Sequence, residues 1–425
     1  MLVIDRTQAP EVKSLNSFSI IKARKLKLAN GIPVYSIKSG TQEIVKIELV
    51  FNAGNYFEMR PGLAFLTTKM LNEGTASLSA KDISEKIAFY GASLELFPGN
   101  DKISISMTAL TKHLPYLLPL LQDIVQNASF PEENFENLKN IQSQQLKINM
   151  QKTAFVASGL FKHHVFGENH PYGYFLSPEI LESLSVSDCV GYHASKIKDN
   201  SYEIIISGMV TDAVITDIER VFGSTKTKFP TPVTIKKEAR GSGKNRVVEA
   251  KENSLQCSLR IGRKLFTRNH PDYIKFLVLN EALGGYFGSR LMKNIREEKG
   301  LTYGIYSQAV SMINEGFFVI GTDVKKELAE TAVSEIYKEI EALKFSLISD
   351  EELNVVKNYM LGSFMGSLNT HFQLAEKFKT IHFSGMEYSF FDKYIETIKT
   401  VSAKELMQLA EKYFDKSNFT EVIVG

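Results

Sequence analysis

Two stretches about 215 residues apart repeat one pattern, and this repeat limits the chain to a fold that can be built twice. Residues 184–208 read LSVSDCVGYHASKIKDNSYEIIISG, and residues 399–425 read KTVSAKELMQLAEKYFDKSNFTEVIVG. Each stretch runs from a Val-Ser cap through an amphipathic helix and a lysine-containing turn to an apolar strand that ends at glycine. The repeat therefore predicts a duplicated domain of roughly 210 residues.

A second pair of segments supports this duplication and a boundary between the halves. Residues 132–140 (EENFENLKN) match residues 351–358 (EELNVVKN) at nearly the same offset. Between the halves, GSTKTKFPTPVTIKKEARGSGKNR has the Pro, Gly, Ser, Thr and Lys content of a linker. We expect a first domain over residues 1–222, a linker over residues 223–246 and a second domain over residues 247–425.

Strand and helix patterns alternate within each half. The stretch KLKLANGIPVYSIKS alternates on both sides of Asn30-Gly31, a strong hairpin signal. Further strand patterns occupy residues 43–55, 102–110 and 201–208, and helical patterns occupy residues 61–73, 80–91, 111–127 and 131–150. The sequence predicts an α+β fold of two homologous domains, each a mainly antiparallel sheet packed against helices on one face.

Composition and charge exclude several classes of function. Fifty basic and 48 acidic residues give a net charge of +2 without a long basic run, which argues against nucleic acid and a membrane surface as partners. Cys189 and Cys257 form no CxxC pair, which excludes a disulfide framework and a thiolate zinc site. No apolar run reaches the roughly 18 residues of a membrane helix. We expect a cytoplasmic protein, or a periplasmic one if a signal was removed.

Residues 62–75 read GLAFLTTKMLNEGT, and this segment resembles the zinc-binding helix of the M16 metallopeptidases. The family includes pitrilysin, insulin-degrading enzyme and the mitochondrial processing peptidase, and its active members read like GLAHFLEHMLFKGT here. Two histidines four residues apart bind zinc on one helical face, and the glutamate between them polarises the attacking water. The resemblance covers nearly the whole chain and implies a duplicated M16/LuxS-like fold.

The residues that flank this motif match the family, whereas the four chemical positions do not. Phe65 and Lys69 stand where the two histidines would be, and Thr68 stands at the glutamate position. In the family a further glutamate lies about 76 residues beyond the second histidine, and here that position is Gln145. The first histidine of the chain is His113, and the Lys69 ammonium would repel a cation. We therefore expect no metal and no cofactor in this chain.

The second half contains a different motif of the same family. Residues 279–304 read LNEALGGYFGSRLMKNIREEKGLTYG. In active members an arginine and a tyrosine seven residues apart reach the zinc site of the opposite half-molecule and hold the substrate backbone, and Arg296 and Tyr303 have this spacing. A guanidinium can bind carbonyl oxygens, and a phenol can donate to a developing oxyanion. The alternatives are a surface ion pair of Arg296 with Glu297 or Glu298, and ordinary strand packing of Tyr303.

Three further segments leave alternatives open. Gly284, Gly285 and Gly288 resemble the glycine-rich substrate-handling loop of the processing peptidase's non-catalytic subunit, which implies contact with peptide, but they also suit a closely packed turn. The histidine cluster in FKHHVFGENHPYG has no spacing of a known metal site. The polar helix over residues 131–150 is either a solvated face or a cavity wall that faces a partner.

The chain thus lacks the zinc half of an M16 site and retains the Arg/Tyr half. This asymmetry resembles the bacterial heterodimers of the family, in which one subunit binds zinc and the other contributes the Arg/Tyr pair. The resemblance implies a subunit that is inactive alone and pairs with a zinc-bearing homologue, or with itself, around a peptide substrate. The alternatives are a non-enzymatic binding or scaffold protein, as in respiratory-complex core subunits, and a homodimeric peptidase with an unusual site.

Overall fold

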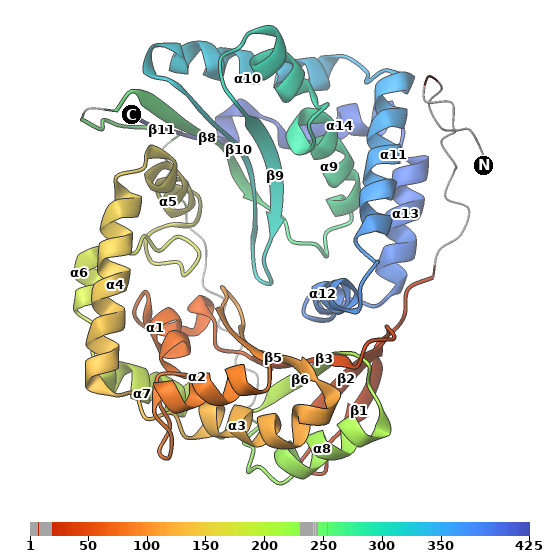
Figure 1. Ribbon diagram of the computed structural model, residues 1–425. Coiled ribbons are helices and arrows are strands. Elements are labelled where there is room, and N and C mark those ends of the chain that lie inside the picture. The colour runs from red at the N-terminus through yellow and green to blue at the C-terminus, as the bar shows by residue number, and fades with distance from the viewer. Residues whose placement is uncertain (1–6, 8–18, 230–240, 242, 244, 253) are drawn as a thin grey trace.

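Two sheets with their own layers of helices make up the structure, a computed structural model that describes residues 7, 19–229, 241, 243, 245–252 and 254–425. Figure 1 shows the two halves facing each other, joined on one side by α4 and α5 and on the other by α11, α12 and α13. No helix among the described residues is long and apolar enough to span a membrane. Much of the predicted linker, residues 223–246, lies outside the described residues, so its bounds stay a prediction.

The first half contains six strands in the order β1-β2-β6-β3-β5-β4, all antiparallel except the β2–β6 pair. The Asn30-Gly31 hairpin is confirmed, because β1 pairs with β2 across it and Gly31 has a φ of 95°. The elements are β1 (Arg24–Lys27), β2 (Pro33–Lys38), β3 (Ile44–Phe51), η1 (Asn55–Phe57), α1 (Leu63–Met70), α2 (Ala80–Phe89), β4 (Ser93–Pro98), β5 (Ile103–Leu110), η2 (Thr111–His113), α3 (Leu114–Gln126), α4 (Glu132–Met150), α5 (Thr153–Phe166), α6 (Pro178–Glu182), α7 (Val186–Lys196), β6 (Tyr202–Gly208) and α8 (Asp212–Phe222).

The second half repeats this topology without a counterpart of β1. Its strand order is β7-β11-β8-β10-β9, and only the β7–β11 pair is parallel. The elements are β7 (Arg246–Glu249), β8 (Gln256–Leu265), α9 (Tyr273–Asn280), η3 (Glu281–Gly285), η4 (Met292–Glu298), β9 (Ile305–Ser311), β10 (Gly316–Lys325), η5 (Lys326–Leu328), α10 (Ala329–Phe345), α11 (Asp350–Gly366), α12 (His371–His382), α13 (Ser389–Thr400), α14 (Ala403–Tyr413), η6 (Lys416–Asn418) and β11 (Thr420–Val424).

The repeated segments occupy equivalent places in the two sheets. Strand β6 lies between β2 and β3, and β11 lies between β7 and β8. The helix before each strand begins with a capping box, at Ser185 in α7 and at Ser402 in α14. Matching the two Val-Ser pairs would place the first cap at Ser187, which is wrong. The Asp188 carboxylate accepts the backbone N–H of Ser185, so the helix begins two residues earlier.

Alternation along the strands divides each sheet into an apolar and a more polar face. On β5, Ile103, Ile105 and Met107 enter the core under the helices of the first half, while Ser104 and Ser106 face the other way. Strand β4, which the sequence analysis did not predict, forms one edge of this sheet. The helices of each half thus cover one face of its sheet, as predicted, and leave the second face open to the opposite half.

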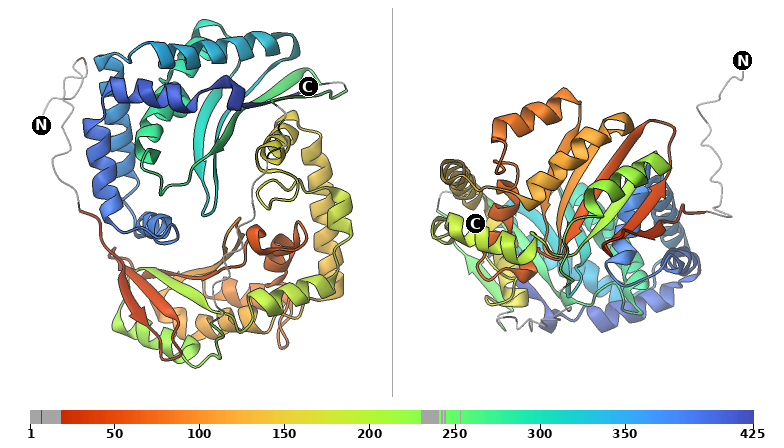
Figure 2. Two further views of the ribbon diagram at one scale, coloured as in Figure 1. Left: turned by 180° about the vertical axis from the view of Figure 1, so that it is seen from behind. Right: turned by 90° about the horizontal axis from the view of Figure 1, so that it is seen from below.

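One helix from each half crosses over and covers part of that second face. Helix α5 packs on β8 and β11 of the other half, where Phe161 and Ala157 meet Val422 and Val424. Helix α12 packs on β2 and β6 of the first half, where a second apolar cluster forms from Leu374, Ala375, Phe378, Tyr35, Ile37 and Ile205. Both crossings are visible in Figure 1 and from behind in Figure 2. The two halves therefore hold each other by a reciprocal exchange of helices.

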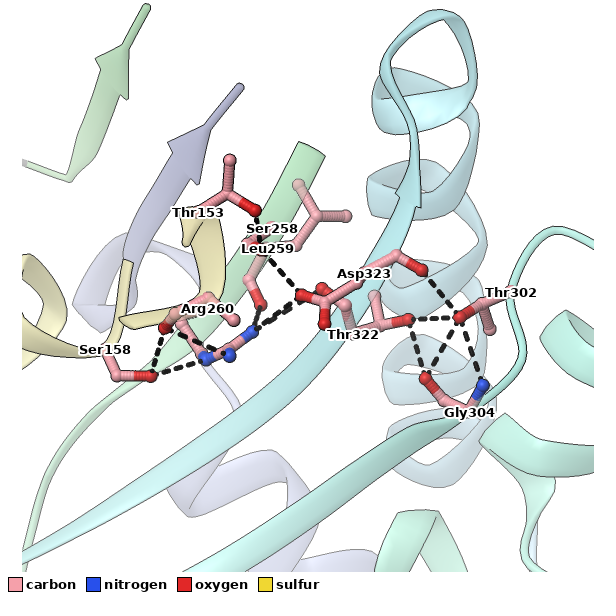
Figure 3. Close-up of polar contacts among 10 residues, drawn as sticks. Thr153, Ser158, Ser258, Leu259, Arg260, Thr302, Gly304, Thr322 and Asp323 are labelled. Carbon is pink, nitrogen blue, oxygen red and sulfur yellow. Dashed lines mark hydrogen bonds and ion pairs between the residues drawn. The ribbon is translucent and has the colours of Figure 1, made fainter. Parts of the chain in front are cut away.

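A charged side chain of the sheet anchors each crossing helix. Under α12, the buried Glu48 carboxylate of β3 accepts hydrogen bonds from the Lys379 ammonium at 2.8 and 3.0 Å. Burial lowers the pKa of Lys379, but the carboxylates of Glu48 and Glu376 together outweigh this effect and leave the pKa raised. Under α5, the buried Arg260 guanidinium of β8 donates to Ser158 Oγ at 3.0 Å and to the Ala154 carbonyl at 3.4 Å (Figure 3). Glu48 and Arg260 lie on equivalent strands of the two sheets.

The tip of the β9–β10 hairpin makes a further contact between the halves. Asp101, in the turn between β4 and β5, accepts hydrogen bonds from the backbone N–H of Ile313 and the side chain of Asn314, both at 3.2 Å. Tyr172 also donates to the Asp101 carboxylate. Burial, followed by the charge of Asp101, raises the pKa of the Tyr172 phenol. This contact holds the edge of the second sheet against the first half.

The Glu48–Lys379 anchor leads to a stability prediction. Lys379→Met leaves the Glu48 carboxylate buried without its charged partner, and removal of one partner from a buried pair costs about 3 kcal/mol or more. We expect a loss of about 3 kcal/mol in the free energy of unfolding, measured by urea unfolding. Lys393→Met is the control, because Lys393 is exposed on α13 and has no described partner. Equal losses for the two variants would contradict the anchor, whereas Glu48→Gln combined with Lys379→Met should lose less than Lys379→Met alone.

Candidate functional site

Helix α1 retains its place in the core although its chemical residues differ from the M16 motif. Gly62 precedes the helix with a φ of 88°, a conformation that favours glycine. The buried Glu58 carboxylate accepts the backbone N–H groups of Gly62 and Ala64 at 3.2 and 2.9 Å, which satisfies donors at the helix start. The helix thus begins at Leu63 and ends at Met70, three residues before the end of the predicted helix.

The residues at the metal positions use their polar groups inside the fold. Thr68 is fully buried, and its hydroxyl donates to the Ala64 carbonyl at 2.6 Å. The Lys69 ammonium donates to the Leu96 carbonyl of β4 at 2.9 Å, and Phe65 packs against the core. On the neighbouring helix α4, Gln145 is exposed and donates to Asn149 at 3.3 Å. A phenyl ring, a bonded hydroxyl, an ammonium and an exposed amide do not fit zinc.

The histidines of the described chain do not form a metal site. No group of three His, Cys, Asp or Glu side chains among the described residues could hold an ion. His163 and His164 lie on α5 with their rings 5.2 Å apart, at an angle of 85°. His170 is buried and stacks on Phe166, where α5 meets the second sheet. The cluster is therefore divided: His163 and His164 lie on the surface of α5, whereas His170 lies in an apolar interface.

The motif of the second half forms two π-helical turns: η3, which ends with Gly284 and Gly285, and η4, which begins four residues after Gly288. Such turns are rare and often occur at functional sites. Arg290, which follows the loop, binds Glu352 of α11 through two hydrogen bonds of 2.8 Å. Asn294 donates to Glu339 of α10 at 2.6 Å. These contacts fix Arg290 to α11 and Asn294 to α10.

Glu335 of α10 fixes the end of η4. Its carboxylate is buried beside the ammonium groups of Lys338 at 2.7 Å and Lys299 at 3.0 Å. Hydrogen bonds from Lys338 and Lys299 lower the pKa of Glu335 to about 2, against the opposing effect of burial. Ionic contacts thus fix the segment around Arg296, but Arg296 itself takes part in none of them.

Arg296 has no hydrogen bond or ion pair with a described residue. Its guanidinium carbon lies 4.6 Å from the centroid of the Phe287 ring. The expected alternative, a surface ion pair with Glu297 or Glu298, does not occur in the structure. A cation–π contact orients the guanidinium and leaves its N–H donors available. Arg296 is therefore held in place but remains free to bind carbonyl oxygens.

Tyr303 is 95% exposed on the loop before β9, and its hydroxyl contacts no described residue. The loop itself is fixed, because Thr302 donates to the Asp323 carbonyl at 2.7 Å and Thr322 donates to the Gly304 carbonyl at 2.9 Å. Figure 3 shows that these contacts adjoin the Arg260 cluster beneath α5. Tyr303 does not pack as part of a strand, so the alternative of ordinary strand packing is wrong for this residue.

The three glycines of the loop allow close approach of neighbouring groups. Gly284 is buried, and a Cβ there would lie 2.7 Å from the backbone nitrogen of Ser307. A Cβ on Gly285 would lie 2.6 Å from the Glu281 carboxylate. Gly285 and Gly288 reach the surface, whereas Gly284 does not. The structure accounts for Gly284 by packing against backbone, and contact of the three glycines with peptide stays a prediction.

Two aromatic residues beside the Arg/Tyr pair were missed by the sequence analysis. Phe287, between Gly285 and Gly288, is 63% exposed and supports the Arg296 guanidinium. Tyr306 is 44% exposed on β9 and lies over Gly321, where a Cβ would come within 2.5 Å of its ring. An aromatic residue between two glycines could have drawn attention to Phe287, because glycine-rich turns seldom bury large rings.

The comparisons with known proteins agree on one family. The family model described as Insulinase (Peptidase family M16) matches residues 33–168, and the model described as Peptidase M16 inactive domain matches residues 183–360. An uncharacterized zinc protease YmxG of Bacillus subtilis is 26% identical over 394 residues, which cover 91% of this chain and 94% of that protein. A non-peptidase homolog YmxG of Helicobacter pylori is 22% identical over 395 residues, which cover 89% of this chain and 88% of that protein.

A solved structure shares the fold over nearly its whole length. The crystal structure described as a peptidase M16 inactive domain from Pseudomonas fluorescens has a TM-score of 0.83 and 22% sequence identity. The match covers 95% of this chain and 98% of that chain, and at this identity it shows the fold alone. Each half of the chain matches a model of one family, and the structure has that family's duplicated architecture. The chain belongs to peptidase family M16.

Proposed function

We propose that this chain is the metal-free subunit of an M16-type peptidase, which pairs with a zinc-bearing homologue and orients the peptide substrate. The observation that carries this proposal is that Arg296 and Tyr303 have no polar partner among the described residues. Both side chains lie on segments that are fixed by hydrogen bonds, and neither uses its polar groups within the described chain. Preorganised groups with free donors suit contact with a molecule outside the chain.

The proposed roles follow from the chemistry of the two side chains. The Arg296 guanidinium donates to carbonyl oxygens of the extended peptide. The Tyr303 phenol donates to the oxygen that becomes negative when the peptide bond is attacked. Gly285 and Gly288, at the surface, allow the peptide backbone to approach, while Gly284 serves packing. The hydrolytic chemistry belongs to the partner, because the residues at this chain's own motif do not fit a metal.

A second candidate function is a non-enzymatic M16-like binding or scaffold protein. The replacements at Phe65, Thr68, Lys69 and Gln145 favour it equally, as does the similarity to a relative named as a non-peptidase homolog. The exposed, unpaired Arg296 and Tyr303 favour the paired peptidase, because a scaffold needs no free donors at these two positions. Peptide hydrolysis by this chain with and without a zinc-bearing M16 homologue distinguishes the two functions.

The isolated chain should contain no stoichiometric zinc and show no peptidase activity. The reason is that Lys69 places an ammonium at a metal position and Thr68 uses its hydroxyl within the helix. Metal analysis of the purified chain by plasma mass spectrometry, beside a zinc-bearing homologue as a positive control, provides the measurement. One zinc per chain, retained through dialysis, would refute the metal-free assignment.

Tyr303→Phe should lower the turnover of the reconstituted pair by about 10²-fold, as expected for a lost oxyanion donor. The change removes one hydroxyl that has no described partner, so the fold of this chain should be unaffected. Tyr116→Phe provides the matched control, because Tyr116 is also exposed but lies on α3 in the other half. Steady-state hydrolysis of a fluorogenic peptide measures both variants. Equal turnover for Tyr303→Phe, Tyr116→Phe and the unchanged pair would rule out the proposed role.

A further inference from the structure

A cavity of about 160 Å³ lies behind the glycine-rich loop, apart from the Arg296 and Tyr303 side chains. It opens to solvent between η3, α11, α12 and α13, and its polar lining comes from Glu281, Tyr359, Ser363, Ser367, Lys377 and Tyr394. An engineered cavity of ~150 Å³ in another protein holds benzene. The cavity therefore has room for a ligand of several heavy atoms.

The cavity lining contains a carboxylate without a partner among the described residues. Glu281 begins the π-helical turn η3, is partly buried, and forms no hydrogen bond or ion pair with a described residue. The missing side chain of Gly285 leaves room for it, since a Cβ there would lie 2.6 Å from Glu281 Oε2. Burial raises the pKa of Glu281. Burial and then Glu281 raise the pKa of the Tyr394 phenol, so these two groups share one electrostatic environment.

The other charge in the cavity is an ammonium. Lys377 of α12 lies with its nitrogen 5.3 Å from the centroid of the Phe364 ring and has no carboxylate partner among the described residues. Burial, followed by the nearby charge of Arg268, lowers the pKa of Lys377. Glu281 and Lys377 line the same cavity without forming an ion pair. Two opposite charges thus line one cavity, and both are partly desolvated.

We propose that this cavity binds a small zwitterion of the α-amino acid class. The ligand's ammonium contacts Glu281, and its carboxylate contacts Lys377. A partly buried charge without a partner is costly, and a ligand with both charges satisfies Glu281 and Lys377 at once. A simple amine would leave Lys377 unsatisfied, and a simple carboxylate would leave Glu281 unsatisfied. The phenyl ring of Phe364 and the side chain of Met360 leave an apolar wall for a small aliphatic side chain.

Serine hydroxyl groups in the same lining add to this complementarity. Ser363 lies in the last turn of α11, and Ser367 follows the helix as its C-cap, four residues further on, so both line the cavity. Ser367 already donates to the Phe364 carbonyl at 2.6 Å, whereas the Ser363 hydroxyl has no described partner. Ser363 is therefore available to the ligand's carboxylate. This site is independent of the proposed peptidase pairing, since none of its residues is Arg296 or Tyr303.

The test uses L-valine as the probe, with isobutylamine and 3-methylbutanoate as analogues that lack one charged group each. Isothermal titration of the full chain, with ligand up to about 10 mM, should show valine binding at least about tenfold more tightly than either analogue. Glu281→Gln and Lys377→Met should each weaken valine binding by about tenfold or more. Glu411→Gln and Lys404→Met are the matched controls, because both residues are exposed on α14 and have no described partner.

Ser363→Leu provides a second line of evidence, because it fills the cavity and keeps both charges. It should abolish valine binding while the melting temperature stays close to that of the unchanged chain. The proposal is overturned if valine does not bind, if isobutylamine binds as tightly as valine, or if the charge variants bind like their controls. Neither binding nor the melting temperature involves peptide hydrolysis. A negative result would therefore overturn the proposed cavity ligand without affecting the proposed peptidase role.

Discussion

Helices α5 and α12 each leave their own half and cover the open face of the opposite sheet. This exchange joins two similar units that would otherwise each expose an apolar patch, and the charged anchors at Glu48 and Arg260 fix where each helix lies. A buried ion pair adds little net stability but penalises any arrangement that leaves one charge alone. The exchange thus determines the mutual orientation of the halves more than a purely apolar contact would.

The exchange also reaches the segment that carries the Arg/Tyr pair. Arg260 lies 3.6 Å from Asp323, and the backbone of Asp323 accepts the hydroxyl of Thr302 beside Tyr303. A continuous set of polar contacts thus leads from α5, through β8 and β10, to Thr302 and Gly304, the two neighbours of Tyr303 in the chain (Figure 3). The first half provides no metal ligands at α1, yet its helix α5 supports the position of Tyr303. This support gives the first half a structural part in the proposed site.

Much of the architecture could be predicted from the sequence because it is repeated or local. The repeat revealed the duplication, and Asn30-Gly31 revealed a hairpin. Local patterns could not reveal the crossing of α5 and α12, which depends on contacts between distant residues. Strand β4 was missed because its short, half-exposed alternation lacks a strong apolar signal. The spacing of Arg296 and Tyr303 could be read directly, whereas the exposure of Tyr303 and the contact of Arg296 with Phe287 depend on the three-dimensional structure.

The hydrogen bond from Lys69 to the Leu96 carbonyl bears on how such a chain could recover a metal. Histidine at position 69 would remove the ammonium from an edge-strand carbonyl, and glutamate at position 68 would place a carboxylate where Thr68 is fully buried. Without an ion, that carboxylate would be desolvated and unpaired. Single ligand replacements would therefore weaken the fold before any zinc could compensate, so metal binding and folding would have to return together. The contacts of helix α1 thus oppose the introduction of zinc ligands one residue at a time.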